Sequence, residues 1–262
     1  MPATSQPPSS SPPTGPLAID DPPTGALPAR RSRHVVVVAG GSPPDPRAVN
    51  RLADLAPGTG PPTVIAADRG FDHALELGLQ PDVLIGDLDS IKPESVEQAM
   101  ADGVRIERHP PDKEATDLEL ALDRATALAP TVTVLIGTGP DDRLDHLAAQ
   151  FGLLASPAFA STAIDAWIGR AHLQVVHGPG ERTVRGRLHE LVTLLPVGGP
   201  AVGVTTTGLR FSLHGETLDP FSTRGVSNEI AAALPGQAAD ATVALEQGTL
   251  LIIRPNALEG HP

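Results

Sequence analysis

The aspartates of this sequence recur just after short apolar segments, where several could reach one ligand. Asp68 follows Thr63–Ala67, and Asp87 and Asp89 follow the segment 82–86. Crowded carboxylates repel one another and raise one another's pKa unless a cation neutralises them. Mg²⁺ prefers such oxygen ligands and completes its shell with water and substrate phosphates. The aspartates placed in this way are Asp68, Asp87, Asp89, Asp117 and Asp145. The pattern therefore indicates a magnesium site that meets a phosphate substrate.

Glycines and basic residues occur at the same segment ends. Glycine lets backbone N–H groups approach an anion closely. The glycines concerned are Gly40, Gly41, Gly86, Gly137 and Gly139. Lys113 and Arg143 could meet the charge of a phosphate. Together with the aspartates, these residues suggest phosphoryl transfer from a magnesium-bound nucleotide.

Each piece also has a simpler interpretation. Gly40-Gly41 could form only a tight turn, since neither GxGxxG nor GxxxxGK[ST] is present. Thr116 and Asp117 could be no more than a helix start, where an acidic residue suits the helix dipole. Arg143 and Asp145 could pair on a helix surface. Their common position at one edge of a sheet is what favours a site.

The elements that must position these residues alternate between strand and helix. Continuous apolar runs predict strands buried on both faces, and the segments between them suit helices. We expect strands over 34–39, 63–67, 82–86, 104–108, 131–137 and 160–167, with helices over 46–55, 71–77, 93–101, 117–128 and 143–154. This order predicts a parallel α/β sheet with right-handed crossovers. Ligands of such sheets bind beyond the carboxyl ends of the strands.

The alternation of strand and helix patterns ends after residue 169. There, short apolar runs are separated by Gly and Pro, and helical periodicity is mostly lost. This pattern predicts an antiparallel β-sandwich or barrel. The first 33 residues are rich in Pro and Ser and suit a disordered tail. The expected divisions are therefore a tail over 1–33, an α/β nucleotide- and magnesium-binding domain over 34–169, an all-β domain over 170–255 and a short tail over 256–262.

Composition excludes several classes of protein. The net charge of −12 argues against broad binding to nucleic acid or anionic membrane. Only 2% of the residues are aromatic, too few for base-stacking platforms. Cysteine is absent, which excludes disulfides, thiol catalysis and Cys-ligated zinc. With no long apolar run and no signal-peptide pattern, we expect a cytoplasmic protein and no membrane partner.

Five motifs, in order, resemble those of the thiamine pyrophosphokinase family. The motifs are Ala67–Gly70 with Leu77–Ser90, Asp112–Leu122, Arg143–His146, Gly203–Arg210 and Arg224–Asn228. The resemblance runs from about residue 34 to 254. Two positions depart from the family's usual pattern, since Arg69 stands where a small residue is common and Phe211 where some members carry a larger aromatic residue.

The resemblance implies an α/β catalytic domain followed by a β-sandwich that binds thiamine. The implied reaction transfers pyrophosphate from ATP to the hydroxyl of thiamine, giving thiamine diphosphate and AMP. Asp87, Asp89 and Asp117 match the Mg²⁺ ligands, and Lys113, Arg143 and Asp145 match positions that line the substrate pockets. The nucleotide contacts that we expect are Gly40, Gly41, Asp68, Gly86, Thr116 and Gly137.

The resemblance also implies a homodimer with shared active sites, in which Phe211, Ser227 and Asn228 of the β domain reach thiamine. The short polar groups would orient the pyrimidine, and the Phe ring could cover the cationic thiazolium. Three alternatives stay open: a pyrophosphokinase for another hydroxymethyl heterocycle such as a pterin, a nucleotide-sugar transferase, and a non-catalytic sensor of thiamine or nucleotide. The sequence does not decide whether Asp68 or Asp145 takes the hydroxyl proton.

Overall fold

A computed structural model describes residues 33–58, 60–137, 139, 143–231 and 239–259. The predicted N-terminal tail, apart from Arg33, lies outside the described residues. Among the helices described, none is long and apolar enough to cross a membrane.

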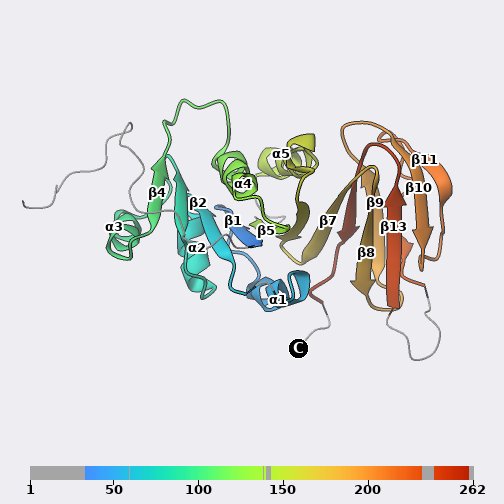
Figure 1. The fold of residues 1–262 in the computed structure, drawn as a ribbon, viewed down its shortest axis with the longest axis horizontal. Helices are drawn as coiled ribbons and strands as arrows, with labels where there is room; N and C mark the ends of the chain where they lie inside the picture. The colour runs from blue at the N-terminus through green and yellow to red at the C-terminus, as the bar shows by residue number, and fades with distance from the viewer. Residues whose placement is uncertain (1–32, 59, 138, 140–142, 232–238, 260–262) are drawn as a thin grey trace, which may run out of the picture.

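Strands and helices alternate through the first part of the chain, as the sequence predicts (Figure 1). The strands are β1 (His34–Val38), β2 (Thr63–Ala67), β3 (Val83–Gly86), β4 (Arg105–Arg108), β5 (Val132–Gly137) and β6 (Ala163–Ile168). The α-helices are α1 (Leu52–Leu55), α2 (Gly70–Glu76), α3 (Pro93–Ala101), α4 (Asp117–Ala127) and α5 (Leu144–Leu154).

One predicted helix takes a different form. The segment 46–55 is a 3-10 helix over Pro46–Arg51 followed by the single turn of α1. The side chain of Asp45 caps the 3-10 helix by accepting a hydrogen bond from the N–H of Arg47 at 3.0 Å. Proline at the first position suits a helix start, because its missing N–H would have no partner there.

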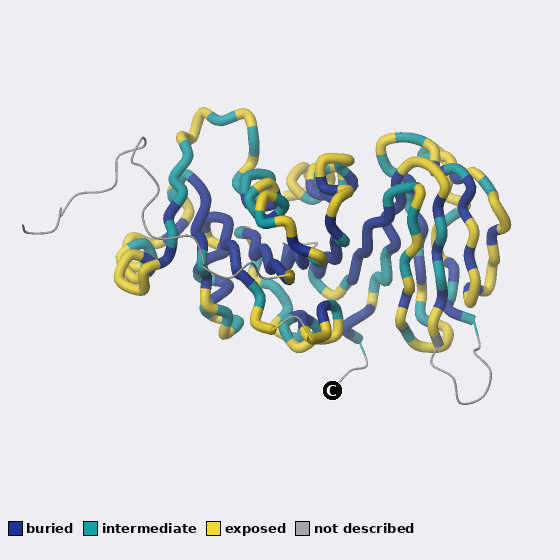
Figure 2. Tube along the Cα trace, in the orientation of Figure 1, coloured by how far each residue is buried: buried dark blue, intermediate teal, exposed yellow. Residues whose placement is uncertain are grey.

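The six strands of this first part pair in parallel in the order β6-β5-β1-β2-β3-β4. The chain moves outward from β1 to β4 and then returns to the other side of β1 with β5. The strand order therefore reverses between β1 and β5, and ligands of open α/β sheets bind at such a switch point. Helices cover both faces of the strands, which are buried throughout β1, β2 and β3 (Figure 2).

The second part is antiparallel. Its strands are β7 (Ala171–His177), β8 (Gly180–Gly186), β9 (Leu191–Pro196), β10 (Ala201–Thr207), β11 (His214–Leu218), β12 (Asn228–Glu229), β13 (Ala239–Leu245) and β14 (Thr249–Arg254). Four of them form a separate sheet in the order β11-β10-β13-β8. This sheet packs on β7, β9 and β14 around buried residues such as Val184, Leu194 and Val243, which gives the predicted sandwich.

The larger sheet of the sandwich is continuous with the parallel sheet. Strand β7 pairs antiparallel with β6, and β14, β9 and β12 follow, so that ten strands form one sheet. Leu173 of β7 and Leu251 of β14 belong to the same apolar cluster as Leu122 of α4. The predicted boundary near residue 169 therefore falls in a turn inside a sheet, and the division into domains stays a prediction.

Residues past the last strand contribute to the core. Ala257 and Leu258 are buried beside Leu52 of α1, within the region expected to be a short tail. The carbonyl oxygen of Leu258 accepts a hydrogen bond from Arg47 Nη1 at 2.9 Å. This contact ties the end of the described chain to the helical face of the sheet.

Candidate active site

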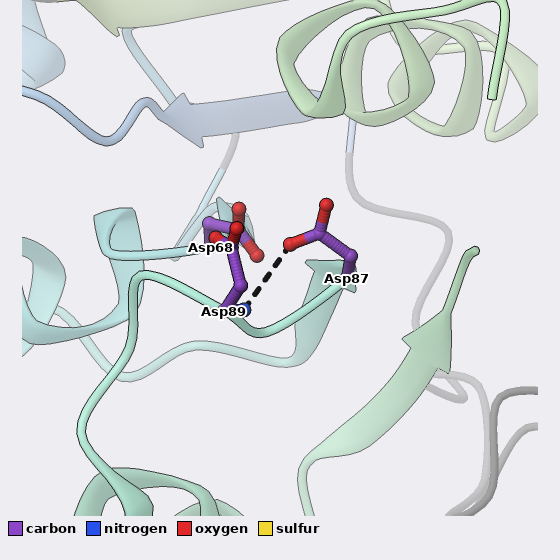
Figure 3. Close-up of side chains that lie close together, drawn as sticks. All are labelled: Asp68, Asp87 and Asp89. Atoms are coloured by element: carbon purple, nitrogen blue, oxygen red, sulfur yellow. Dashed lines mark hydrogen bonds between the residues drawn. The ribbon is translucent and has the colours of Figure 1, made fainter. Parts of the chain in front are cut away.

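Three aspartates converge at the carboxyl ends of β2 and β3. Asp68 directly follows β2, and Asp87 and Asp89 follow β3. One carboxylate oxygen from each lies within 4.8 Å of the others (Figure 3). Asp68 is buried, Asp87 is partly buried and Asp89 is exposed, so the group extends from the protein interior to solvent. Such a cluster of oxygen ligands has the chemistry of a Mg²⁺ site.

The backbone is bent to bring these carboxylates together. Asp68 has a φ of 47° and Leu88 a φ of 66°, both in the left-handed region that non-glycine residues rarely adopt. The N–H of Leu88 donates to Asp68 Oδ1 at 3.0 Å, and the N–H of Asp89 donates to Asp87 Oδ1 at 3.1 Å. The first bond ties the connection after β3 to the connection after β2, and the second lies within the connection after β3. Backbone strain of this kind often clusters at functional sites.

Gly86, the last residue of β3, leaves room for the buried carboxylate. A Cβ at this position would lie 2.0 Å from Asp68 Oδ1 and 3.3 Å from an oxygen of Asp117. Its φ of 153° also disfavours a side chain. The approach is so close that any side chain here would displace Asp68.

Lys113 connects a fourth aspartate to the group. Its Nζ lies 3.0 Å from Asp87 Oδ2 and 2.9 Å from Asp117 Oδ1. Asp117 begins α4, and the hydroxyl of Thr116 caps that helix by accepting from the N–H of Glu119 at 3.2 Å. The helix start thus positions Asp117 beside the other carboxylates, with a positive charge between them.

Burial, neighbouring charges and hydrogen bonds all shift the pKa values of these carboxylates. Burial, together with the charge of Asp117, raises the pKa of Asp68 to about 7. The nearby charge of Asp87 raises the pKa of Asp89. Burial acts to raise the pKa of Asp87 as well, but hydrogen bonds from the Asp89 N–H and from Lys113 outweigh it and lower the pKa. The site therefore favours an added cation.

The predicted glycine contacts lie beside this group at the switch point. Gly40 and Gly41 follow β1, and Gly137 ends its neighbour β5. The carbonyl oxygen of Gly41 lies 2.9 Å from His73 Nε2, which fixes the turn against α2. A Cβ on Gly137 would lie 2.6 Å from Gln150 Nε2 of α5. Gly137 is buried and Gly41 is exposed, at the position where sheets of this type bind nucleotides.

Arg143 and Asp145 are placed differently from the other aspartates. Arg143 Nη2 lies 2.6 Å from Asp145 Oδ2, and both side chains are mostly exposed at the start of α5. Hydrogen bonding from Arg143 lowers the pKa of Asp145 to about 2. Within the described ranges the structure pairs Asp145 with Arg143 and brings the other four expected aspartates together. Residues 138 and 140–142, just before this pair, lie outside the described residues.

The expected thiamine contacts lie on the β-sandwich. Phe211 is exposed, and the guanidinium of Arg210 lies 5.3 Å from the centre of its ring. Asn228 is buried, and its amide bonds the backbone of Phe211, accepting at 3.0 Å and donating at 2.9 Å. Ser227 is exposed at a φ of 60°. Asn228 thus supports the Phe211 backbone, while Phe211 and Ser227 have surfaces open to a ligand.

Phe221 is an exposed aromatic residue that sequence reasoning missed. Its side chain is 98% exposed, in the connection between β11 and β12. Large apolar side chains on a surface often mark contacts with another molecule. The signal that could have found it is its rarity, since the whole chain has five Phe, one Trp and no Tyr.

Two family models match this chain, and both describe domains of the same enzyme family. The model of the thiamin pyrophosphokinase catalytic domain matches residues 60–166, and the model of the thiamin pyrophosphokinase vitamin B1 binding domain matches residues 182–236. Together they cover more than half of the chain. The first match contains all four clustered aspartates, and the second contains Phe211, Phe221 and Ser227.

Individual relatives agree with these models. Thiamine pyrophosphokinase of Bacillus subtilis is 27% identical over 225 residues, which are 85% of this chain and 98% of the relative. A crystal structure of thiamin pyrophosphokinase from Geobacillus thermodenitrificans has a TM-score of 0.65 at 28% identity, covering 84% of this chain and 96% of the other. The Bacillus subtilis crystal structure has a TM-score of 0.68 at 23% identity, with 84% and 98% coverage, and supports the fold.

Proposed function

The chain belongs to the thiamine pyrophosphokinase family, and we propose that its carboxylate group is the centre at which pyrophosphate passes from ATP to the hydroxyl of thiamine. Family membership establishes this ATP-dependent transfer as the activity. The observation that supports the location is the convergence of Asp68, Asp87 and Asp89 within 4.8 Å beside the β1–β5 switch point.

The residues at this centre fit a Mg²⁺ ion. Three carboxylates of different burial converge. Burial, together with the charge of Asp117, raises the pKa of Asp68, and a cation would favour its charged form. Asp87, Asp89 and Asp117 are the proposed ligands, with Asp68 adjacent. The ion would supply positive charge to the triphosphate of ATP. Lys113 already carries part of this charge compensation between Asp87 and Asp117.

The reaction needs a nucleophile, a leaving group and an acceptor for one proton. The thiamine hydroxyl oxygen forms a bond to the β-phosphorus, the bond from that phosphorus to the α–β bridging oxygen breaks, and AMP leaves. The hydroxyl proton passes to a base, and a base works best when its pKa lies near the working pH. We propose Asp68 for this role, because it lies among the clustered carboxylates, whereas Asp145 is paired with Arg143 at the start of α5. Lys113 and Arg143 would stabilise negative charge on the phosphoryl oxygens.

The proposed thiamine contacts belong to the second chain of a homodimer. Phe211 and Ser227 are exposed on the sandwich, whereas the carboxylates lie beyond β2 and β3 in the parallel part of the sheet. A partner subunit could bring its sandwich to this edge, which would place an aromatic ring and a hydroxyl beside the reacting phosphate. We also propose a cytoplasmic location, since the reaction consumes ATP.

One assay tests the proposed function. Purified protein is given Mg²⁺ and ATP with either thiamine or a pterin alcohol, and the release of AMP is measured. We expect AMP to form in equal amount to thiamine diphosphate, and only with thiamine. A matched reaction with EDTA should abolish AMP release if the metal is required. AMP release with the pterin alone would overturn the assignment of thiamine as the acceptor.

A further inference from the structure

The structure contains a cavity away from the carboxylate group. A cavity of about 660 Å³ is lined by residues of α1, of strands β6, β7 and β14, and of β8. In Figure 1, α1 lies between the parallel strands and the four-stranded sheet that ends in β8. The volume is typical of cavities that bind small molecules.

The cavity is separate from the proposed active site. Its lining includes Pro57, in the connection from α1 to β2, which lies at the amino ends of the parallel strands. The clustered aspartates follow the carboxyl ends of β2 and β3. None of these aspartates lines the cavity. A ligand held there would therefore occupy a different place from the nucleotide.

The lining is positively charged although the chain as a whole carries a net charge of −12. Five arginines and three carboxylates line the cavity. The arginines are Arg51, Arg182, Arg185, Arg187 and Arg254. Burial lowers the pKa of His172, so this residue adds no charge at neutral pH. The difference of two charges favours an anionic ligand.

The ion pairs within the lining leave Arg185 without an acidic partner among the described residues, and they make Arg187 share Glu190 with Arg254. Arg51 pairs with Asp54 at 3.3 Å, and Arg182 pairs with Asp165. Arg254 Nη1 lies 3.0 Å from Glu190 Oε1. Arg187 lies 3.8 Å from the same carboxylate group, and Arg185 has no acidic partner within the described part of the chain.

Arg187 and Arg185 both lie in the segment that forms β8 and the connection after it. Both are exposed, so they can move to contact a ligand. Strand β8 is the edge of its sheet among the described residues. No strand of this sheet lies beyond β8 on that side among the described residues. Arg185 and Arg187 can therefore change conformation to contact a ligand in the cavity.

Two buried donor groups of lining residues have no hydrogen-bond partner among the described residues. Trp167 is 3% exposed, and its Nε1 has no hydrogen-bond partner among the described residues. Arg254 Nε is buried and equally unpartnered there. Both groups can only donate hydrogen bonds. Their natural complement is a ligand rich in acceptor oxygens, since leaving buried donors unsatisfied costs free energy.

From these observations we propose that the cavity binds a small phosphorylated anion, with Arg185 and Arg187 contacting its oxygens. Arginine suits this role because its planar donors match the geometry of phosphate oxygens. The anion could be inorganic pyrophosphate or a nucleoside monophosphate, which share this chemistry.

The chain carries its own reporter for the test. Trp167 is the single tryptophan, and tyrosine is absent. Emission excited at tryptophan wavelengths therefore comes from Trp167, which lines the cavity. Inorganic pyrophosphate or AMP is titrated into the full chain in EDTA, so that no metal recruits the anion to the acidic group. We expect a saturable emission change with a Kd below about 1 mM, which weakens as salt is added.

Three variants make the test specific. Arg185→Gln should raise the Kd at least about tenfold, because a charge-assisted hydrogen bond is lost. Arg185→Lys keeps the charge and should retain most of the affinity. Arg33→Gln removes the same charge from an exposed residue outside the cavity and should bind like the unmodified chain.

The results separate the outcomes. Binding of pyrophosphate, AMP or both, weakened by Arg185→Gln but not by Arg33→Gln, supports the proposal and identifies the source of the phosphate. A lack of saturable emission change with either anion overturns it. Equal weakening by the two Gln variants also overturns it, because the effect would then be one of net charge. Circular dichroism confirms that each variant is folded.

Discussion

Asp89 is the exposed member of the three converging carboxylates, and it tests their role directly. Asp89→Asn keeps the shape of the side chain but removes one negative charge. We expect kcat to fall at least about 10²-fold, comparable to the loss of one electrostatic stabiliser in other enzymes. The protein should stay folded, because the change removes a carboxylate from a crowded group. The measurement is AMP release together with the melting temperature.

Asp123→Asn is the matched control for this substitution. Asp123 is an exposed residue of α4, the helix that begins with Asp117, and its replacement changes the net charge equally. Its kcat should equal that of the unmodified chain. Turnover by Asp89→Asn at the control's level, with the Mg²⁺ requirement intact, would remove Asp89 from the mechanism.

Asp68 makes stability depend on pH in the absence of metal. Its pKa in the folded chain is about 7, above the ordinary value of 3.8. A group with a raised pKa stabilises the fold below its ordinary pKa, and this contribution is lost as the pH rises through the folded pKa. The free energy of unfolding in EDTA should therefore fall between about pH 4 and pH 7.

Asp68→Asn should remove much of that dependence. Asn keeps an oxygen that can accept from the Leu88 N–H, but it carries no charge. At pH 8 we expect the variant to be more stable than the unmodified chain by about 1–3 kcal/mol. Denaturant unfolding at pH 5 and pH 8 measures the difference. Identical pH profiles for the two chains would show that Asp68 is not the group responsible.

Gly86, the last residue of strand β3, lets the end of this strand approach Asp68 and Asp117 closely. In Gly86→Ala, the added Cβ would meet Asp68 Oδ1 at 2.0 Å. We expect a loss of about 1–3 kcal/mol of stability, typical of overpacking, and a large fall in kcat as Asp68 is displaced.

The control is Gly103→Ala, at the turn from α3 to β4. Gly103 also has a positive φ, of 73°, but nothing lies within 4 Å of its added Cβ. It should lose roughly 1 kcal/mol of stability through backbone strain alone, with kcat unchanged. If both variants kept full turnover, the close approach at Gly86 would have no part in placing the carboxylates.

The parallel strands could be predicted because each is an apolar run buried on both faces. Strands β8 and β11 give little sequence signal for the opposite reason. Each has few apolar residues and lies at an edge of the four-stranded sheet, where only some of its side chains face the core. The pairing of β6 with β7 could not be predicted either, because a residue pattern indicates strands but not which sheet they join.

In the candidate site too, some features could be predicted from the sequence and others could not. The convergence of Asp68, Asp87 and Asp89 follows from their positions at strand ends, which the sequence reveals. The pairing of Asp145 with Arg143 depends on side-chain geometry, which a residue pattern does not specify. That Asn228 bonds the Phe211 backbone depends on a contact between residues far apart in sequence, which no local pattern encodes.

At the scale of the whole molecule, mixed dimers test the shared active site. A chain carrying Asp89→Asn is mixed with one carrying Phe211→Ala, each nearly inactive alone. If a site takes its carboxylates from one subunit and its Phe211 from the partner, a mixed dimer has one intact site. Random mixing should then restore about a quarter of normal activity.

The control mixes each variant with itself under the same conditions, and native mass measurement confirms that mixed dimers form. If each site lay within a single chain, every site in the mixture would keep one defect. Activity that stays at the level of the separate variants, with mixed dimers present, would contradict sharing.

The unbroken ten-stranded sheet limits how this molecule can move. A hinge between the α/β part and the sandwich would have to break the ladder that joins β6 to β7, in which Asp165 faces Gln174 and Ile168 faces Ala171. The α/β part and the sandwich are therefore joined rigidly through this ladder. Grafting a foreign sandwich onto this chain would require matching strand registers as well as choosing a linker.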